Sequence, residues 1–154
     1  MVSENILTGS FTEFFADVEP RLRQALAAAL GADQGREAAA EAMAWGWEHW
    51  EQLHDMSNPA GYLYKVGRSR SRHLFRRPPV LPPVQPDHIP EVEPGLPHAL
   101  AQLSERQRVV VVLVHSLGWS QTETAELLGV SLATVHTHLE RGLKRLRSEL
   151  GAKR

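Results

Sequence analysis

The sequence predicts an all-α protein of two small helical domains joined by a proline-rich linker. Apolar residues recur at three- and four-residue steps in both halves of the chain, which is the spacing of amphipathic helices. Several of these segments open on the S-x-x-E or S-x-x-Q capping pattern. Eight of the ten prolines fall between Pro78 and Pro97, and such a stretch cannot be a helix interior. We therefore expect a domain at 10–77, an acidic linker at 78–97 and a helix-turn-helix domain at 98–150.

The first domain is expected to hold three helices. Ser10 and Glu13 form a capping box, and apolar residues follow at helical steps until Gly31 ends the segment. A second helix is expected at about 34–54, and after a break at Ser-Asn-Pro a third is expected at about 60–77.

The second domain contains a helix-turn-helix pattern. A capping box at Ser104 opens a segment whose valine run is β-prone, but the box and the surrounding helices favour a helix. A second box at Ser120 opens a helix of about two turns that ends at Gly129, and Ser131 caps the last helix. Ala125 is small where two helices of this motif must approach closely. The pattern therefore indicates a helix-turn-helix module.

Charge is segregated along the chain although the formal net charge is only −1. Residues 1–60 carry ten acids against three cations, whereas residues 61–77 carry six cations and no acid. The stretch 78–99 is net −3 and the stretch 100–154 is net +3. Blocks of like charge favour separate partner surfaces, and the basic blocks are candidates for binding phosphate. Solvated charge scattered by chance is the alternative interpretation.

The composition excludes several classes of protein. The chain has no cysteine, which excludes disulfides, thiolate zinc sites and a cysteine nucleophile. It shows no signal-peptide pattern and no apolar run near the ~20 residues of a membrane helix, so we expect a soluble, cytoplasmic protein without a membrane partner. The histidines lack the spacing of helical zinc ligands, and no catalytic constellation appears. We expect no metal, no cofactor and no enzymatic activity.

The last helix is the candidate DNA-reading element. In helix-turn-helix modules the second helix enters the major groove with its N-terminal residues foremost, and later cations contact phosphates. The predicted DNA-binding residues of this helix are Ser131, Ala133, Thr134, His136, Thr137, His138, Arg141, Lys144 and Arg145. A helical hairpin that contacts only protein is the alternative.

A second candidate surface lies in "GYLYKVGRSRSRHLFRR". Its cations recur at helical steps and can follow a phosphate backbone, while its aromatic residues suit stacking on unpaired bases. The predicted DNA-binding residues here are Tyr62, Lys65, Arg68, Ser69, Arg72, His73 and Arg76. For Tyr64, base stacking and simple core packing are equally good interpretations.

These segments together carry a specific resemblance. "LPHALAQLSERQRVVVVLVHSLGWSQTETAELLGVSLATVHTHLERGLKRLRSEL" resembles region four of the extracytoplasmic-function (ECF) bacterial sigma factors. "AMAWGWEHWEQL" followed by "NPAGYLYKVGRSRSRHLFRR" resembles region two of the same family. The two regions stand in the right order, are joined by an acidic proline-rich linker, and cover nearly the whole chain.

The resemblance implies a dissociable specificity subunit of RNA polymerase, with RNA polymerase core and promoter DNA as partners. Region two would dock on the polymerase clamp and melt the minus-ten element, while region four would bind the minus-thirty-five element. An anti-sigma protein is a further candidate partner. The rival functions are a sigma-like DNA-binding regulator that does not itself initiate transcription, and an interaction module held by an anti-sigma protein.

The helix at 34–54 is the expected polymerase-binding surface, with Glu37, Glu41 and Trp45 as its contact residues. The apolar stripe of this helix places Trp47 and Trp50 in the core. Since Trp45 is two residues from Trp47, it points away from that stripe. An exposed interface anchor is one interpretation of Trp45, and accidental surface exposure or a second buried face is an equally good one.

Several positions depart from the usual residues of the family. Glu37 and Ala40 stand where Asp and Gln are usual, and Trp45 stands where Arg is common. Ser69 and His73 stand where Asn and Asp are frequent near the melting segment. These departures bear on how strongly the chain binds core polymerase.

The N-terminal end of the last helix, which is expected to contact the bases, also departs from the usual residues of the family. Leu132, His136 and His138 stand there in place of what are often Glu, Lys and Arg. Neutral imidazoles leave this end mostly uncharged at pH 7, and nearby DNA phosphate favours the imidazolium. We therefore expect promoter affinity to rise as pH falls from about 8 to 6 through His136 and His138. Hydrogen bonds from the two neutral imidazoles to bases are the alternative.

Overall fold

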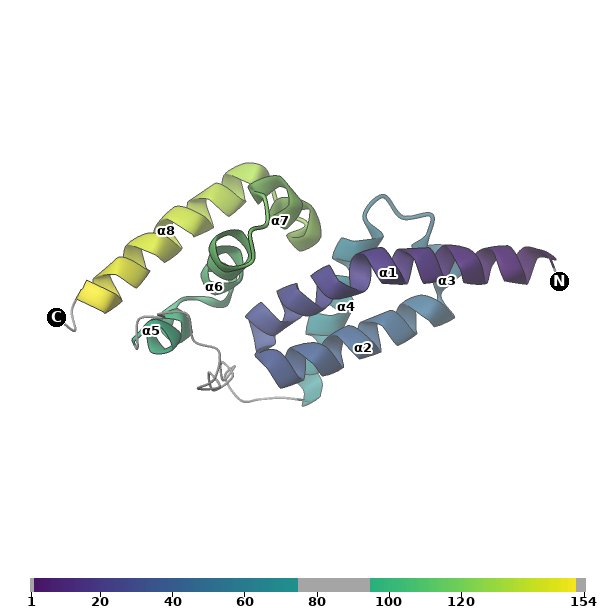
Figure 1. Cartoon of the computed structure of the whole chain (residues 1–154), viewed down its shortest axis with the longest axis horizontal. Helices are drawn as coiled ribbons and strands as arrows, with labels where there is room; N and C mark the ends of the chain where they lie inside the picture. The colour runs from purple at the N-terminus through teal and green to yellow at the C-terminus, as the bar shows by residue number, and fades with distance from the viewer. Residues whose placement is uncertain (1, 75–94, 152–154) are drawn as a thin grey trace.

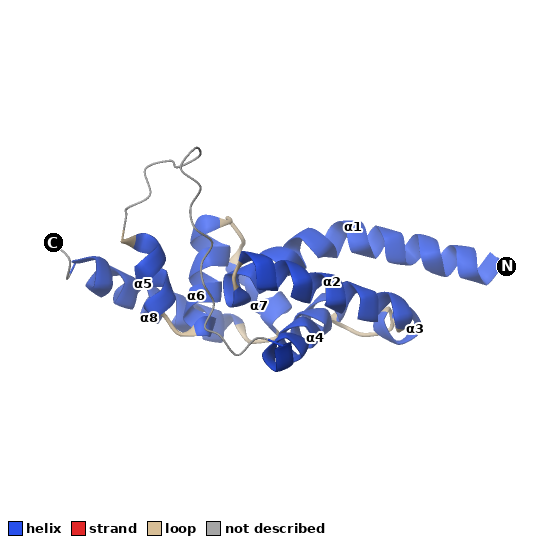
Figure 2. Cartoon of the chain, turned by 90° about the horizontal axis from the view of Figure 1, so that it is seen from below, coloured by secondary structure: helices blue, strands red, loops and turns tan. Residues whose placement is uncertain are grey.

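The computed structural model describes residues 2–74 and 95–151, which form helices joined by short turns and contain no strand (Figures 1 and 2). The predicted all-α class is confirmed. The β-prone valine run is helical: Ser104 caps it through the expected box with Gln107, and its last turn widens into a π-helix.

The first half of the chain consists of α1 (Val2–Leu30), α2 (Ala32–Glu48), α3 (Trp50–Leu53) and α4 (Pro59–Leu74). Gly31, at φ 94°, turns the chain back so that α2 lies along α1 (Figure 1). The two helices cross at Gly35, where a Cβ would lie 2.4 Å from the Cα of Ala27. The absence of a side chain at Gly35 therefore allows backbone-to-backbone packing.

The second half consists of α5 (Leu96–Gln102), α6 (Glu105–Val111), the π-helix η2 (Val112–Ser116), α7 (Gln121–Leu128) and α8 (Leu132–Gly151). Its own core is small. The buried residues of that core are Leu103, Val110, Val111, Ala125, Val135 and Leu139.

Several predicted helix boundaries differ from the structure. Ser10 lies inside α1 and caps nothing, because α1 already begins at Val2. The single helix expected at 34–54 is interrupted at His49, whose φ of −116° and ψ of 28° separate α2 from α3. The linker expected at 78–97 falls mostly outside the described residues, and its last two residues belong to α5.

The two halves pack directly against each other. Val109, Leu113, Trp119 and Leu127 from the second half join the large apolar core built by α1, α2 and α4. Figure 1 shows α6 lying between α8 and the C-terminal end of α1. The candidate DNA-binding helices α4 and α8 therefore belong to one packed body.

Candidate nucleic-acid interface

The helix-turn-helix geometry predicted for α7 and α8 is present. Ser120 caps α7 in a box with Glu123, and Gly129 adopts the left-handed conformation at φ 66°. The amide of Val130 then donates to the carbonyl of Ala125 at 3.1 Å, which closes the turn. Ser131 Oγ accepts from the amide of Thr134 at 3.1 Å and thereby caps α8.

One polar residue stands at a buried position of this motif, and a hydrogen bond accommodates it. Thr124 is fully buried where an aliphatic residue is usual, and its Oγ1 donates to the carbonyl of Ser120 at 2.9 Å. The hydroxyl is thus satisfied inside the helix, and the methyl group remains available for packing.

Helix α8 has one buried and one exposed face. Val135, Leu139 and Gly142 hold it against the rest of the second half. The predicted DNA-binding residues that lie exposed are Ser131, Ala133, His136, Thr137, Arg141, Lys144 and Arg145. The hydroxyls of Ser131 and Thr134 form a hydrogen bond of 2.8 Å, so both side chains are already engaged in capping α8.

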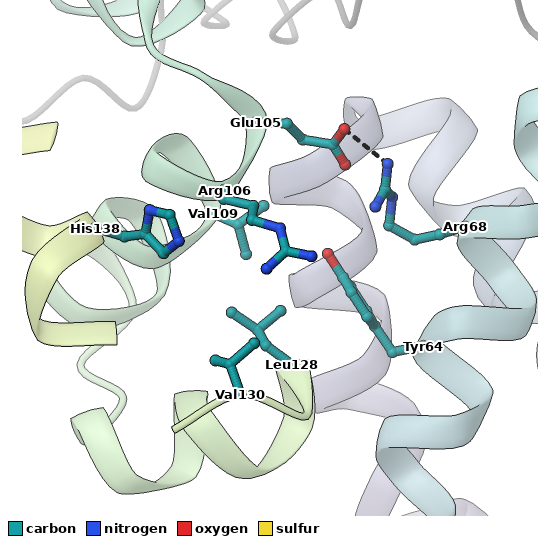
Figure 3. Close-up of a pocket in the computed structure, with 8 residues that line it drawn as sticks. All are labelled: Tyr64, Arg68, Glu105, Arg106, Val109, Leu128, Val130 and His138. Carbon is teal, nitrogen blue, oxygen red and sulfur yellow. Dashed lines mark hydrogen bonds and ion pairs between the residues drawn. The ribbon is translucent and has the colours of Figure 1, made fainter. Parts of the chain in front are cut away.

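His138 occupies a different side of α8 from the exposed residues. It is half-buried and faces α4 and α6 across a cavity of about 50 Å³ (Figure 3). Burial, followed by the charges of Arg106 and Arg141, lowers the pKa of His138 below its usual value. The imidazolium form is therefore disfavoured there, which opposes a contribution of His138 to the expected pH response.

On α4, the predicted residues Tyr62, Lys65 and Ser69 are exposed. Arg68 is half-buried, and its guanidinium donates to Glu105 of α6 at 2.7 Å (Figure 3). The side chains of Arg72 and His73 lie outside the described part of the structure, as does Arg76 entirely.

Tyr64 packs in the core, which decides between the two interpretations open from the sequence. It is buried beneath α6 and α7, and burial raises its pKa to about 12. A ring in this position cannot stack on a base while the two halves are packed together.

The tryptophans are arranged differently from the prediction. Trp45 is half-buried, with its ring 4.2 Å from the ring of His49 and 5.3 Å from that of Tyr62, which favours a second buried face over a fully exposed anchor. Trp47 was expected in the core but is 50% exposed, whereas Trp50 is buried as predicted.

The exposed Trp47 belongs to an apolar groove between α1 and α2 that sequence reasoning missed. Phe15, itself 43% exposed, lines the groove together with Ala40 and Ala44. Ala40, Ala44 and Trp47 recur at helical steps, and this second stripe was the available signal. Of the two predicted acidic contacts on α2, Glu37 is exposed and Glu41 is half-buried.

Besides the contact of Arg68 with Glu105, further polar contacts join the two halves of the chain. The buried guanidinium of Arg108 donates to the carbonyls of Ala28 at 3.0 Å and Ala29 at 2.8 Å, at the C-terminal end of α1. The indole of Trp119 donates to Gln24 Oε1 at 3.0 Å. The sequence signal for this buried contact was the position of Arg108, a charged residue directly before a run of valines.

Two further findings concern the described residues alone. They contain no group of three or more His, Asp or Glu side chains placed to hold a metal ion. None of their helices combines the length and apolarity that crossing a membrane requires.

The fold and the exposed cationic face of α8 define a helix-turn-helix DNA-binding protein. Residues 95–146 match the family model described as sigma-70, region 4. The RNA polymerase sigma-E factor of Streptomyces coelicolor is 35% identical over 123 residues, which span 73% of this chain and 69% of that protein. The ECF RNA polymerase sigma factor SigL of Mycobacterium tuberculosis is 30% identical over 150 residues, spanning 86% and 85%. The chain belongs to the ECF family of RNA polymerase sigma factors.

Solved structures share the fold. The sigma factor RpoE, in complex with the anti-sigma factor NepR from Bartonella quintana, superposes with a TM-score of 0.63 at 20% identity. That match covers 94% of this chain and 99% of RpoE. CnrH, in complex with the cytosolic domain of CnrY, gives a TM-score of 0.60 at 21% identity and covers 96% of this chain and 91% of CnrH.

Proposed function

We propose that this chain directs RNA polymerase core to promoters by placing α8 in the major groove of the upstream element and α4 along the downstream element. The observation that carries the proposal is the capped helix-turn-helix with an exposed face of Ala133, Thr137, Arg141 and Lys144. Small residues near the start of α8 allow close approach to base edges, and later cations contact phosphates. The chain itself catalyses no step and acts in the cytoplasm together with the polymerase.

On the side of α4, exposed Tyr62 and Lys65 form the surface for the melted strand. The Tyr62 ring is 40% exposed and rests against Trp45, which in turn stacks on His49. A ring held from behind in this way offers one face to an unpaired base, and such stacking contributes about 1–3 kcal/mol per base. Lys65, one turn along the same helix, supports the proposal by supplying a phosphate contact.

The polymerase is proposed to bind the outer face of α2. Glu37 and Trp47 are exposed there, and the groove beside Trp47 and Phe15 offers an apolar centre. Interfaces of this kind draw most of their affinity from a few buried aromatic anchors. Trp47 replaces the half-buried Trp45 as the anchor in this proposal. An anti-sigma protein, as in the RpoE structure, is proposed as the regulator.

The test is run-off transcription with the full chain, core polymerase and a set of genomic promoters. Specific initiation is expected from the unchanged chain, and the double change Arg141→Ala with Lys144→Ala is expected to abolish it at 150 mM salt. Loss of two phosphate contacts should reduce the salt dependence of promoter binding by about two units of slope. Promoter binding without transcription would instead support the DNA-binding regulator.

A further inference from the structure

Glu140 is an acid in the middle of the surface assigned to DNA. It lies on the exposed face of α8, opposite the buried Val135 and Leu139, and its side chain is 74% exposed. It is followed by Arg141 and Lys144, and the next acid in the sequence is Glu149 near the end of the helix. Its carboxylate lies 3.8 Å from Nε2 of His136, one turn earlier in the helix.

The contact with His136 does not account for this placement. Exposed pairs one helical turn apart contribute little to stability, and this one attracts only when the imidazole is protonated. A carboxylate on a helix that enters DNA is also repelled by the phosphates on both sides of the groove. Unless a base offsets that repulsion, Glu140 weakens the binding that Arg141 and Lys144 support.

Among the four bases, cytosine provides the matching group. An ionised carboxylate only accepts hydrogen bonds. In the major groove cytosine presents its N4 amino donor, whereas guanine presents two acceptors, thymine an acceptor and a methyl group, and adenine an amino donor beside the N7 acceptor. A carboxylate therefore favours cytosine and is opposed by the acceptors of the other bases.

The neighbouring side chains allow the approach that this contact needs. Ala133 and Thr137 share the exposed face with Glu140 and are small. The longer side chain of Glu140 is therefore not screened by these two neighbours from a duplex placed on this face. We propose, on the basis of the function proposed above, that Glu140 selects a cytosine at one position of the upstream promoter element.

The experiment uses the full chain with core polymerase on a promoter library randomised in the upstream element, followed by sequencing of the transcripts. The unchanged chain is expected to enrich cytosine at one position by about 5- to 150-fold, the range of one good base contact. Glu140→Gln is expected to move the preference at that position to adenine, since an amide pairs with both adenine N6 and N7. Glu140→Ala is expected to lose the preference there and keep those at the other positions.

The control is Glu149→Gln, which removes the same charge from the same helix nine residues further along and should keep the cytosine preference. A second arm replaces the selected cytosine by pyrimidin-2-one, which lacks the amino group. This base should reduce transcription by the unchanged chain and leave Glu140→Ala unaffected.

Identical base preferences in the unchanged chain and both Glu140 variants would overturn the assignment of Glu140. No transcripts from the unchanged chain on any promoter would instead refute the proposed function, so the two failures are distinguishable.

Discussion

Arg108 shows at the scale of one residue how the halves are joined. Its guanidinium is buried and satisfies two carbonyls that the end of α1 leaves without helical partners. Burial lowers the pKa of Arg108, and the nearby carboxylate of Glu105 partly offsets that effect. A helix C-terminus is an electrostatically favourable place for a cation.

Replacing Arg108 by Met should therefore destabilise the protein. The change keeps most of the volume but leaves the carbonyls of Ala28 and Ala29 buried and unpaired, at a cost of about 3 kcal/mol. Urea unfolding followed by circular dichroism measures the loss. Arg147→Met, on the exposed side of α8, is the control and should change stability by less than about 0.5 kcal/mol. Equal stability of the two variants would contradict a structural role for Arg108.

Tyr64 makes stability depend on pH in the alkaline range. Burial raises its pKa to about 12, whereas the unfolded chain ionises near 10. Its contribution is therefore fully present below pH 10 and is lost as pH rises towards 12, by about 2–3 kcal/mol in all. Tyr64→Phe removes this dependence. The measurement is the difference in unfolding free energy between the two proteins from pH 9 to 11.5, and a difference that does not vary with pH would contradict the burial of the phenol.

At the scale of elements, the crossing of α1 and α2 depends on Gly35. Ala would favour the helical state of α2 by about 1 kcal/mol, but its Cβ would lie 2.4 Å from the backbone of Ala27. The helices must then separate, so we expect Gly35→Ala to destabilise the protein by about 1–3 kcal/mol. Thermal unfolding measures the effect. Gly151→Ala, where a Cβ meets nothing within 4 Å, is the matched control and should leave the melting temperature unchanged.

The helices themselves could be predicted from the sequence because their signals are local. Capping boxes at Ser104 and Ser120 and the turn at Gly129 involve residues a few positions apart, and all three are where the pattern placed them. It was harder to predict from the sequence which face of α2 is buried. The predicted stripe held Met43, Trp47, Trp50 and His54, but the chain changes direction at His49, so the helical period does not continue across the break. Trp47 precedes the break and lies on the exposed stripe of α2 with Ala40 and Ala44, while Trp50 follows the break and is buried.

At the scale of the whole molecule, sequence periodicity could not predict that the halves pack together. The contact of Arg108 with Ala28 joins residues 80 apart, and that of Trp119 with Gln24 joins residues 95 apart. No local pattern encodes such pairs. As a result of this packing, Glu105 of α6 contacts Arg68 of α4, which is a predicted DNA-binding residue.

We expect a DNA phosphate and the Glu105 carboxylate to compete for the Arg68 guanidinium. Glu105→Gln removes the competing charge, so we expect the free chain to bind a fluorescent promoter duplex more tightly, with a salt dependence about one unit of slope steeper. Fluorescence anisotropy at four salt concentrations measures both quantities. Glu48→Gln removes an equal charge from the exposed surface of α2 and should leave the slope unchanged. If the two variants bind alike, Arg68 is either free to reach DNA in the packed state or takes no part in binding. Either result would exclude a competition between the second half of the chain and DNA at Arg68.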